Sequence, residues 1–217
     1  MLYNIIGLPG SGKSTLCKKL QEKFPNEMIY DEDVLYCKVI KSILDHKKKY
    51  KNLLSPKYND AIIVLINRKF ENKLLEMLAN NKDKKVIIFS PQAILTNPEN
   101  NEIYGKVVEI AIDIDIDTLY YQKNSRVTKE QIKYQKELLE MYKTEKNETI
   151  LMLRKALMGM HPITYYYRAS IEELIFQFKE MVVKYKIPLM TMQEIYNLLS
   201  EAPGFLRNPP LKPVPLH

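Results

Sequence analysis

The stretch Gly7–Ser14, with the sequence GLPGSGKS, constrains this chain more than any other. In the spacing G-x-x-x-x-G-K-S, glycines let the backbone curl so that successive N–H groups point inward at phosphate oxygens. We expect Lys13 to reach the β- and γ-phosphates of a nucleotide, and the Ser14 hydroxyl to bind Mg²⁺. The sequence therefore predicts a nucleotide phosphate site, with contacts from Gly7, Pro9, Gly10, Ser11, Gly12, Lys13, Ser14 and Thr15.

The segments on either side of this loop have the patterns that such a site needs. Leu2–Ile6 is a short apolar run typical of a buried strand, and Thr15–Phe24 carries its apolar residues on one helical face. The amino end of a helix adds its dipole to a phosphate site. The alternative is a chance turn, or a degenerate loop that has lost its nucleotide.

Composition favours a globular protein of one main domain. The chain has 217 residues, 46% of them hydrophobic, and no apolar run approaches the roughly 20 residues of a membrane span. The chain enters the loop almost at once, so we expect no signal peptide. Cys17 and Cys37 have neither disulfide nor zinc spacing, and we expect a cytoplasmic protein with no membrane partner. Oligomeric state stays open.

Positive charge is concentrated in two stretches of a chain whose net charge is +7. Residues 38–51 carry six lysines against Asp45, and residues 122–136 carry five basic residues against Glu130. These stretches are either surfaces that attract the phosphates of a nucleotide or nucleic acid, or solvated helix faces.

Strands alternate with helices along the chain. We expect further strands over 28–30, 84–90, 106–113, 163–167 and 187–192, and helices over 34–46, 57–80, 118–121, 128–145, 148–158, 171–184 and 193–200. This order predicts an α/β fold, a three-layer, doubly wound parallel sheet with helices on both faces. Ligands of such sheets bind at the carboxyl ends of the strands, so Gly7, Asp31–Asp33 and Ser90 are expected to share one crevice. The proline-rich residues 203–217 are expected to be an extended tail.

Three aspartates alternate with isoleucines at Asp113, Asp115 and Asp117. They are either a metal site or the end of a strand followed by a helix cap, with Asp115 or Asp117 capping a helix that starts near Thr118. The cap is the simpler interpretation.

Sequence signals of other nucleotide-binding classes are missing. Residues 81–84 lack the final aspartate of the N-K-x-D sequence that GTPases use for guanine, and no LSGGQ sequence of ABC transporters occurs. Motor and AAA-type ATPases end a buried strand in an acid, whereas the strand over residues 84–90 ends in Ser90. These absences leave the small kinases.

Asp31-Glu32-Asp33, directly after the second expected strand, carries a resemblance to a known group. With the loop, it is similar to P-loop kinases such as polynucleotide 5′-hydroxyl kinases, adenylylsulfate kinase, zeta toxins and chloramphenicol phosphotransferase. The resemblance covers about residues 1–145 and implies an aspartate that faces the acceptor hydroxyl and takes its proton. We favour Asp33 as this base and Asp31 as second choice. Alternatively, Asp33 is only a helix N-cap and Asp31 a solvated turn residue.

The resemblance also implies a lid, which we place at residues 121–147. Arg126, with Lys123 and Lys129 nearby, is the residue expected to fold over the phosphates and stabilise charge on the transferring group. A solvated basic helix is the alternative. Tyr36 stands where the group frequently has an arginine, which leaves acceptor recognition open.

The function that this resemblance implies is an ATP- and Mg²⁺-dependent kinase. Its γ-phosphate goes to a hydroxyl or phosphate of a nucleic-acid-related acceptor: a 5′-hydroxyl polynucleotide, a nucleoside or a nucleoside monophosphate. The alternatives are a small-metabolite or toxin-type kinase, and a non-catalytic ATP-binding regulatory module. Weaker expectations are acceptor contacts from Ser90 and Gln92, and an Arg168 that ends a strand and reaches the crevice. His161 is expected to be structural.

Overall fold

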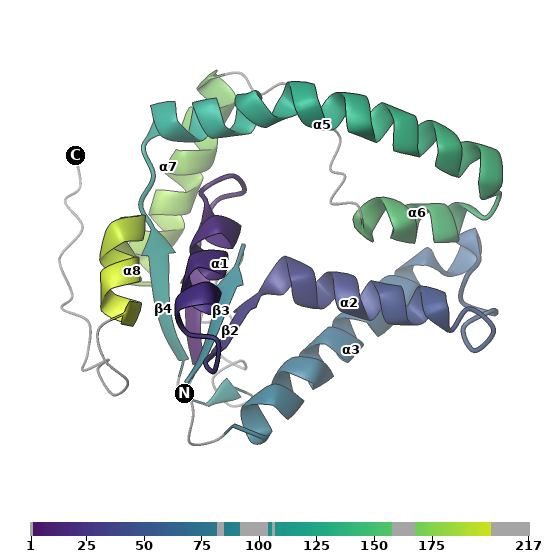
Figure 1. Cartoon of the computed structure of the whole chain (residues 1–217), viewed down its shortest axis with the longest axis horizontal. Coiled ribbons are helices and arrows are strands. Elements are labelled where there is room, and N and C mark those ends of the chain that lie inside the picture. Colours follow the sequence, from purple (N-terminus) through teal and green to yellow (C-terminus); the bar gives the residue numbers. More distant parts are fainter. Residues whose placement is uncertain (1, 82–84, 92–103, 106, 158–167, 201–217) are drawn as a thin grey trace. The chain divides into compact units, whose positions relative to one another are not determined.

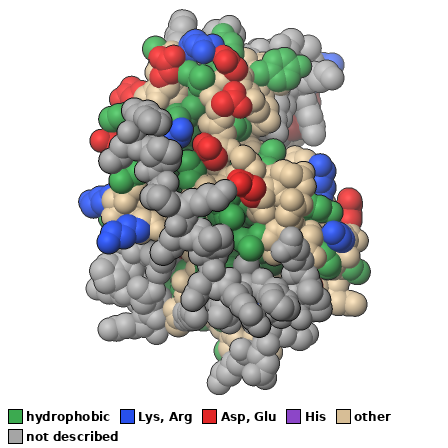
Figure 2. All heavy atoms as spheres, turned by 90° about the vertical axis from the view of Figure 1, so that its left-hand side faces the viewer, with side chains coloured by type: hydrophobic (Ala, Val, Ile, Leu, Met, Phe, Trp, Pro, Cys, Tyr) green, Lys and Arg blue, Asp and Glu red, His purple; other side chains and the backbone are tan. Residues whose placement is uncertain are grey.

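A computed structural model describes residues 2–81, 85–91, 104–105, 107–157 and 168–200, with backbone only for 126–135 and 138 (Figure 1). The expected strand over 163–167, the tail, Gln92 and His161 lie outside the described residues. The chain divides into two compact units, the first of residues 1–32, 77–123 and 166–217, the second of residues 33–76 and 124–165. On the face drawn in Figure 2, acidic side chains recur among hydrophobic and basic ones.

A five-stranded parallel sheet forms the first unit (Figure 1). Its order is β2-β3-β1-β4-β5, and every pair of neighbouring strands is parallel. The parallel α/β sheet predicted from the sequence is therefore confirmed. The strands are β1 (Leu2–Ile6), β2 (Met28–Asp31), β3 (Val86–Ser90), β4 (Val107–Ile112) and β5 (Leu189–Met190).

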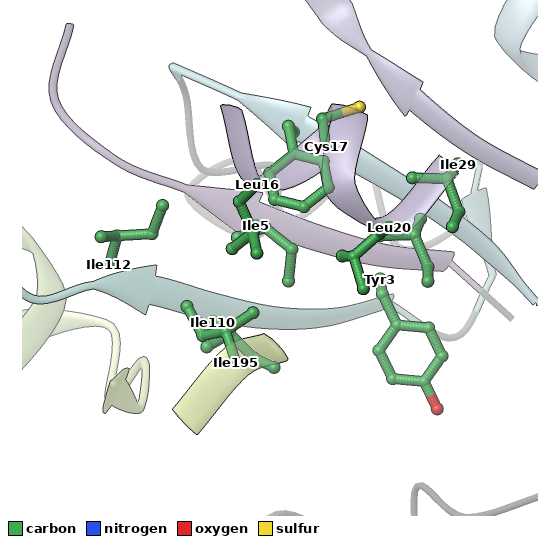
Figure 3. Close-up of a cluster of buried hydrophobic side chains, with 11 residues drawn as sticks. Tyr3, Ile5, Leu16, Cys17, Leu20, Ile29, Ile110, Ile112 and Ile195 are labelled. Carbon is green, nitrogen blue, oxygen red and sulfur yellow. The ribbon is translucent and has the colours of Figure 1, made fainter. Parts of the chain in front are cut away.

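Helices cover both faces of this sheet. On one face, Tyr3 and Ile5 of β1 pack with Leu16 and Leu20 of α1 (Lys13–Lys23) and with Ile195 of α8 (Met192–Ser200), as Figure 3 shows. On the other face, Ile6 and Ala111 pack against Val182 of α7 (Arg168–Lys184). Alternation of side chains along each strand divides the core between the two faces, as expected for a doubly wound arrangement.

The second unit is helical. It contains α2 (Glu32–Asp45) from Asp33 on, the short helix η1 (Pro56–Tyr58), most of α3 (Asn59–Ala79), the part of α5 (Ile116–Thr144) from Asn124 on, and α6 (Glu148–Leu157). Asn147 caps α6, because its Oδ1 accepts from the Ile150 N–H at 3.0 Å while its Nδ2 donates to the Leu54 carbonyl at 2.9 Å. The core of this unit is formed by Val39, Ile40, Ile43, Leu54, Ile62, Ile66, Ile150 and Leu153.

Three local predictions are wrong. Helix α2 begins at Glu32, so Asp33 lies inside its first turn and is not the N-cap. Residues 116–144 form one helix where two were expected with Lys123–Arg126 between them, because this stretch has no glycine or proline to break it. Arg168 begins α7 rather than ending a strand, and it pairs with Asp117 and Glu172.

Each of the three alternating aspartates has its own structural partner. Asp115 caps α5, since its carboxylate accepts from the Thr118 N–H at 2.8 Å and from the Thr118 hydroxyl at 2.6 Å. Asp113 lies 3.8 Å from the Lys179 ammonium, and Asp117 pairs with Arg168. The cap interpretation is thus confirmed for Asp115. The part of the chain that the structure describes contains no group of three His, Cys, Asp or Glu residues suited to a metal. None of its helices is long and apolar enough to cross a bilayer.

Replacing Asp115 with alanine is expected to lower the melting temperature by a few degrees at pH 7, because the first turn of α5 loses its cap. The hydrogen bonds from Thr118 lower the pKa of Asp115, so the carboxylate stabilises the fold above its ordinary pKa of about 4. This contribution is lost as the pH falls through the lowered pKa. Thermal melts from pH 7 to pH 2 should therefore show a penalty that shrinks in acid. Asp115→Asn, which keeps a capping oxygen, is expected to lose less, and an equal loss from Asp117→Ala would contradict this assignment.

Candidate functional site

The loop from Gly7 to Ser14 leaves β1 at the carboxyl end of the sheet and leads into α1. Within it, the Ser11 N–H donates to the Leu8 carbonyl at 3.0 Å. The Lys13 ammonium donates to the carbonyls of Gly7, at 2.6 Å, and Leu8, at 3.1 Å. Lys13 therefore reaches back across the curl of its own loop, and its charge lies where the chain leaves the sheet.

The first turn of α1 has the polarity of an anion site. Gly12 is its N-cap residue and supplies no capping side chain, and no acidic residue lies in the first turn. Its N–H groups thus keep their partial positive charge for another acceptor. Ser14 and Thr15 are exposed in this turn, and Pro9 is exposed in the loop.

Ser11 is a polar residue of the loop with a fully buried side chain. Its hydroxyl makes no hydrogen bond within the described part of the chain, although the residue borders a cavity. A buried hydroxyl without a partner costs free energy, about 1–3 kcal/mol in mutational data. A ligand in the cavity that accepts or donates a hydrogen bond would remove that cost.

Lys123 of α5 packs its side chain against the loop. A Cβ added to Gly10 would lie 3.1 Å from Lys123 Cγ, and only 9% of Lys123 is exposed. The Lys123 side chain therefore lies beside the loop, whereas the lid predicted from the sequence stays a prediction. Arg126 lies three residues further along α5, where the structure gives the backbone alone.

Gly12 makes an equally close contact on the other side of the loop. Its φ is 90°, and an added Cβ would lie 2.8 Å from Met192 Sδ at the start of α8. Both the backbone conformation and the available space therefore require glycine here.

Gly12→Ala is accordingly expected to destabilise the chain by about 1–3 kcal/mol, measured by urea unfolding. Gly105→Ala is the matched control: Gly105 also has positive φ, 68°, but no described atom lies within 4 Å of its added Cβ. Removing the thioether with Met192→Ala should recover part of the Gly12→Ala loss. Equal losses at Gly12 and Gly105, with no recovery, would show that the Met192 contact is unimportant.

A cavity of about 730 Å³ adjoins the loop within the first unit. This volume lies in the range of small-molecule and cofactor sites. Three segments enclose it: the start of α1, the link from β4 to α5, and the link from β5 to α8. The lining residues are Ser11, Thr15, Leu16, Lys19, Asp113, Ile114, Asp115, Thr118, Thr191, Met192, Gln193 and Tyr196.

Most of these lining residues were missed from the sequence. Thr191, Met192, Gln193 and Tyr196 follow β5, in a part of the chain that carries no motif. The rule that ligands bind at the carboxyl ends of parallel strands would have pointed to them, had it been applied to the last strand as well as to the first three.

Strand register places Asp31 and Ser90 at the same edge as the loop. Asp31 pairs with Phe89 in β3, and Ser90, the next residue, pairs with Ile6, which directly precedes Gly7. Gly7, Asp31 and Ser90 therefore lie at one edge of the sheet, whereas the adjacent cavity is lined by other residues, so a crevice shared by these three stays a prediction. Asp33 falls in the second unit and is described there alone.

The carboxylate of Asp31 also acts on α1. Burial, and then the charge of Asp31, raises the pKa of the Cys17 thiol to about 12, against a smaller opposing effect of Lys18. Since Cys17 follows Lys13 by one helical turn, a negative charge lies beside the helix that begins in the loop. Cys17 itself is buried in the core and stays protonated at neutral pH.

This edge of the sheet thus combines a glycine loop with an inward-reaching lysine, an uncapped helix start, a second lysine, a carboxylate and an adjacent cavity. Neither the protein-family models nor the curated proteins compared with the chain match it.

Proposed function

We propose that the chain is an ATP-dependent phosphotransferase of the P-loop kinase type, acting on a nucleic-acid-related acceptor. The observation that carries this proposal is the uncapped start of α1, below a loop that holds the Lys13 ammonium and beside a cavity of nucleotide size. A polyphosphate has the charge that such a helix start and lysine attract, and the cavity has room for the base and sugar.

The donor half of the reaction rests on the loop. N–H groups of the loop and of the first turn of α1, other than the Ser11 N–H that donates to Leu8, would bind the β- and γ-phosphates, with Lys13 beside them and Lys123 against Gly10. In the cavity, the Tyr196 ring and the Met192 thioether offer apolar contact to a base, and Thr118 and Gln193 offer polar groups. The Ser11 hydroxyl would gain a partner from the nucleotide.

A magnesium ion fits the residues at the start of α1. Mg²⁺ binds through one or two protein oxygens and takes its remaining ligands from phosphates and water, so a cluster of three acids is not required. The exposed Ser14 hydroxyl in the first turn of α1 would be such a ligand. When bound, Mg²⁺ neutralises charge on the phosphates of the donor.

The acceptor half rests on an aspartate. In the proposed step, the acceptor oxygen forms a bond to the γ-phosphorus, and the bond between that phosphorus and the leaving ADP breaks. A carboxylate takes the proton of the acceptor hydroxyl. We assign this role to Asp31, which shares the sheet edge with the loop and acts on α1. Asp33, favoured by the sequence, is the alternative.

Radiolabelled ATP and a panel of acceptors test the proposal. The panel contains a 5′-hydroxyl oligonucleotide, nucleosides, nucleoside monophosphates and sugar nucleotides. Label should pass to at least one of the nucleic-acid-related compounds and require Mg²⁺. Label on a sugar nucleotide alone would favour a small-metabolite kinase. ATP binding with no labelled acceptor would favour a non-catalytic module and overturn the proposal.

A further inference from the structure

The segment between α2 and α3 in the second unit is strongly basic. Its thirteen residues, from His46 to Tyr58, contain five lysines and no acidic residue. Lys48, Lys49, Lys51 and Lys57 are exposed, and among the described residues an ion pair joins Lys47 of the segment to Glu145 at 4.0 Å. Asp45 and Asp60 flank the segment, so its positive charge has acidic borders.

Two tyrosines lie among these lysines. The Tyr50 ring has the Lys49 ammonium 5.8 Å from its centroid and the Lys69 ammonium, from α3, at 5.6 Å. The Tyr58 ring has the Lys57 ammonium at 5.5 Å, and 42% of Tyr58 is exposed. These distances suit cation–π contacts, which hold the ammonium groups beside the rings. Lysine ammonium groups therefore lie beside both aromatic rings of this segment.

The apolar residues of the segment point away from this surface. Leu54 is buried in the core of the second unit, and Leu53 packs against it. A membrane-binding segment instead exposes leucine or phenylalanine for insertion beside its lysines. Among the exposed residues of the segment, the large apolar group is the Tyr58 ring, which has the shape and polarity to stack on a base.

Single-stranded nucleic acids carry the groups that these lysines and tyrosines can bind. Their phosphates are spaced along a flexible chain and their unpaired bases stack on aromatic rings with little sequence preference.

We propose that Lys48, Lys49, Tyr50, Lys51, Lys57, Tyr58 and Lys69 form a lysine–tyrosine surface that binds single-stranded nucleic acid. Phosphates bind the lysines, and a base stacks on Tyr58. The inference rests on the proposed function only in naming the acceptor as a polynucleotide rather than a mononucleotide. Binding itself needs neither ATP nor phosphotransfer.

Fluorescence anisotropy with the full chain tests the surface. The probe is a labelled single-stranded oligonucleotide of about 15 nucleotides, titrated without ATP from about 50 to about 200 mM salt. The quadruple change Lys48→Gln, Lys49→Gln, Lys51→Gln and Lys57→Gln should weaken binding about 100-fold at the low salt. It should also reduce the slope of log K against log salt by about 3, since each phosphate contact on a single strand contributes about 0.7.

A matched control removes the same charge elsewhere. Lys18→Gln, Lys23→Gln, Lys184→Gln and Lys186→Gln change four exposed lysines of the first unit, none of them in the proposed surface. This control should weaken binding less than about 3-fold, because it removes the same charge but none of the proposed phosphate contacts. Equal weakening by the two quadruple variants would overturn the proposal. So would binding to phosphatidylserine vesicles with none to the oligonucleotide.

Tyr58 separates stacking from charge. Tyr58→Ala should weaken oligonucleotide binding about 10-fold with an unchanged salt slope, and Tyr58→Phe should bind like the natural chain. No effect of Tyr58→Ala would remove stacking from the proposal and leave only phosphate contacts, which contradicts it as stated. Phosphotransfer to mononucleotides without oligonucleotide binding would overturn the surface and leave the kinase standing. Oligonucleotide binding without phosphotransfer to any acceptor would do the reverse.

Discussion

Lys13→Ala is expected to lower kcat/KM for phosphotransfer by about 10³-fold or more. In the proposed reaction, the ammonium would be the positive charge that the loop itself supplies to the transferring phosphate. It also donates to the Gly7 and Leu8 carbonyls, so its loss removes two contacts that hold the curl of the loop. We therefore expect ATP binding to weaken together with turnover.

Two further variants serve as comparisons for Lys13→Ala. Lys13→Arg keeps the charge but not the compact ammonium, and it should recover ATP binding better than turnover. Lys18→Ala removes an exposed lysine from the same helix and should leave kcat/KM within about 3-fold. Label transfer and nucleotide binding are measured side by side, with melting temperatures to confirm folding. Full activity of a folded Lys13→Ala chain would exclude the loop as the donor site.

Asp31→Asn is expected to lower kcat by about 10²- to 10⁴-fold while ATP affinity changes little. The amide keeps the size of the carboxylate but takes up no proton, so the acceptor hydroxyl loses its base. Because Asp31 ends β2 at the edge where the loop begins, the effect should appear in the chemical step rather than in folding.

Asp33→Asn is the matched comparison, two residues further on. Asp33 lies in the first turn of α2, where a carboxylate interacts favourably with the helix dipole. Its replacement should therefore lower the stability slightly and leave kcat almost unchanged. A large loss of kcat from Asp33→Asn with none from Asp31→Asn would return the role of base to Asp33. Equal loss of ATP binding and turnover from Asp31→Asn would indicate a structural residue.

The α5 helix shows where sequence reasoning succeeded and failed. The capping role of Asp115 follows from local chemistry, an acid ahead of a helix, and was predicted correctly. The break expected near Lys123–Arg126 came from dividing this polar stretch into two helices, although no glycine or proline supports a break there. The absence of helix-breaking residues was therefore the better guide to the length of α5.

The amino-acid sequence by itself determined the loop, the parallel α/β sheet and the edge at which Gly7, Asp31 and Ser90 meet. These depend on short-range spacing, on the alternation of strands and helices, and on the fixed relation between parallel strands and their carboxyl ends. Such patterns can be read within a few residues of each other along the chain.

Only the tertiary structure decided what surrounds the loop. Lys123 against Gly10, Met192 against Gly12, and the cavity that reaches Tyr196 join residues from more than a hundred to almost two hundred positions apart. Tertiary structure also decided the surroundings of Tyr50, because its ring lies near both its neighbour Lys49 and Lys69 of α3. No periodicity marks these contacts, because they follow from packing whole elements on each face of a sheet or around a helical core.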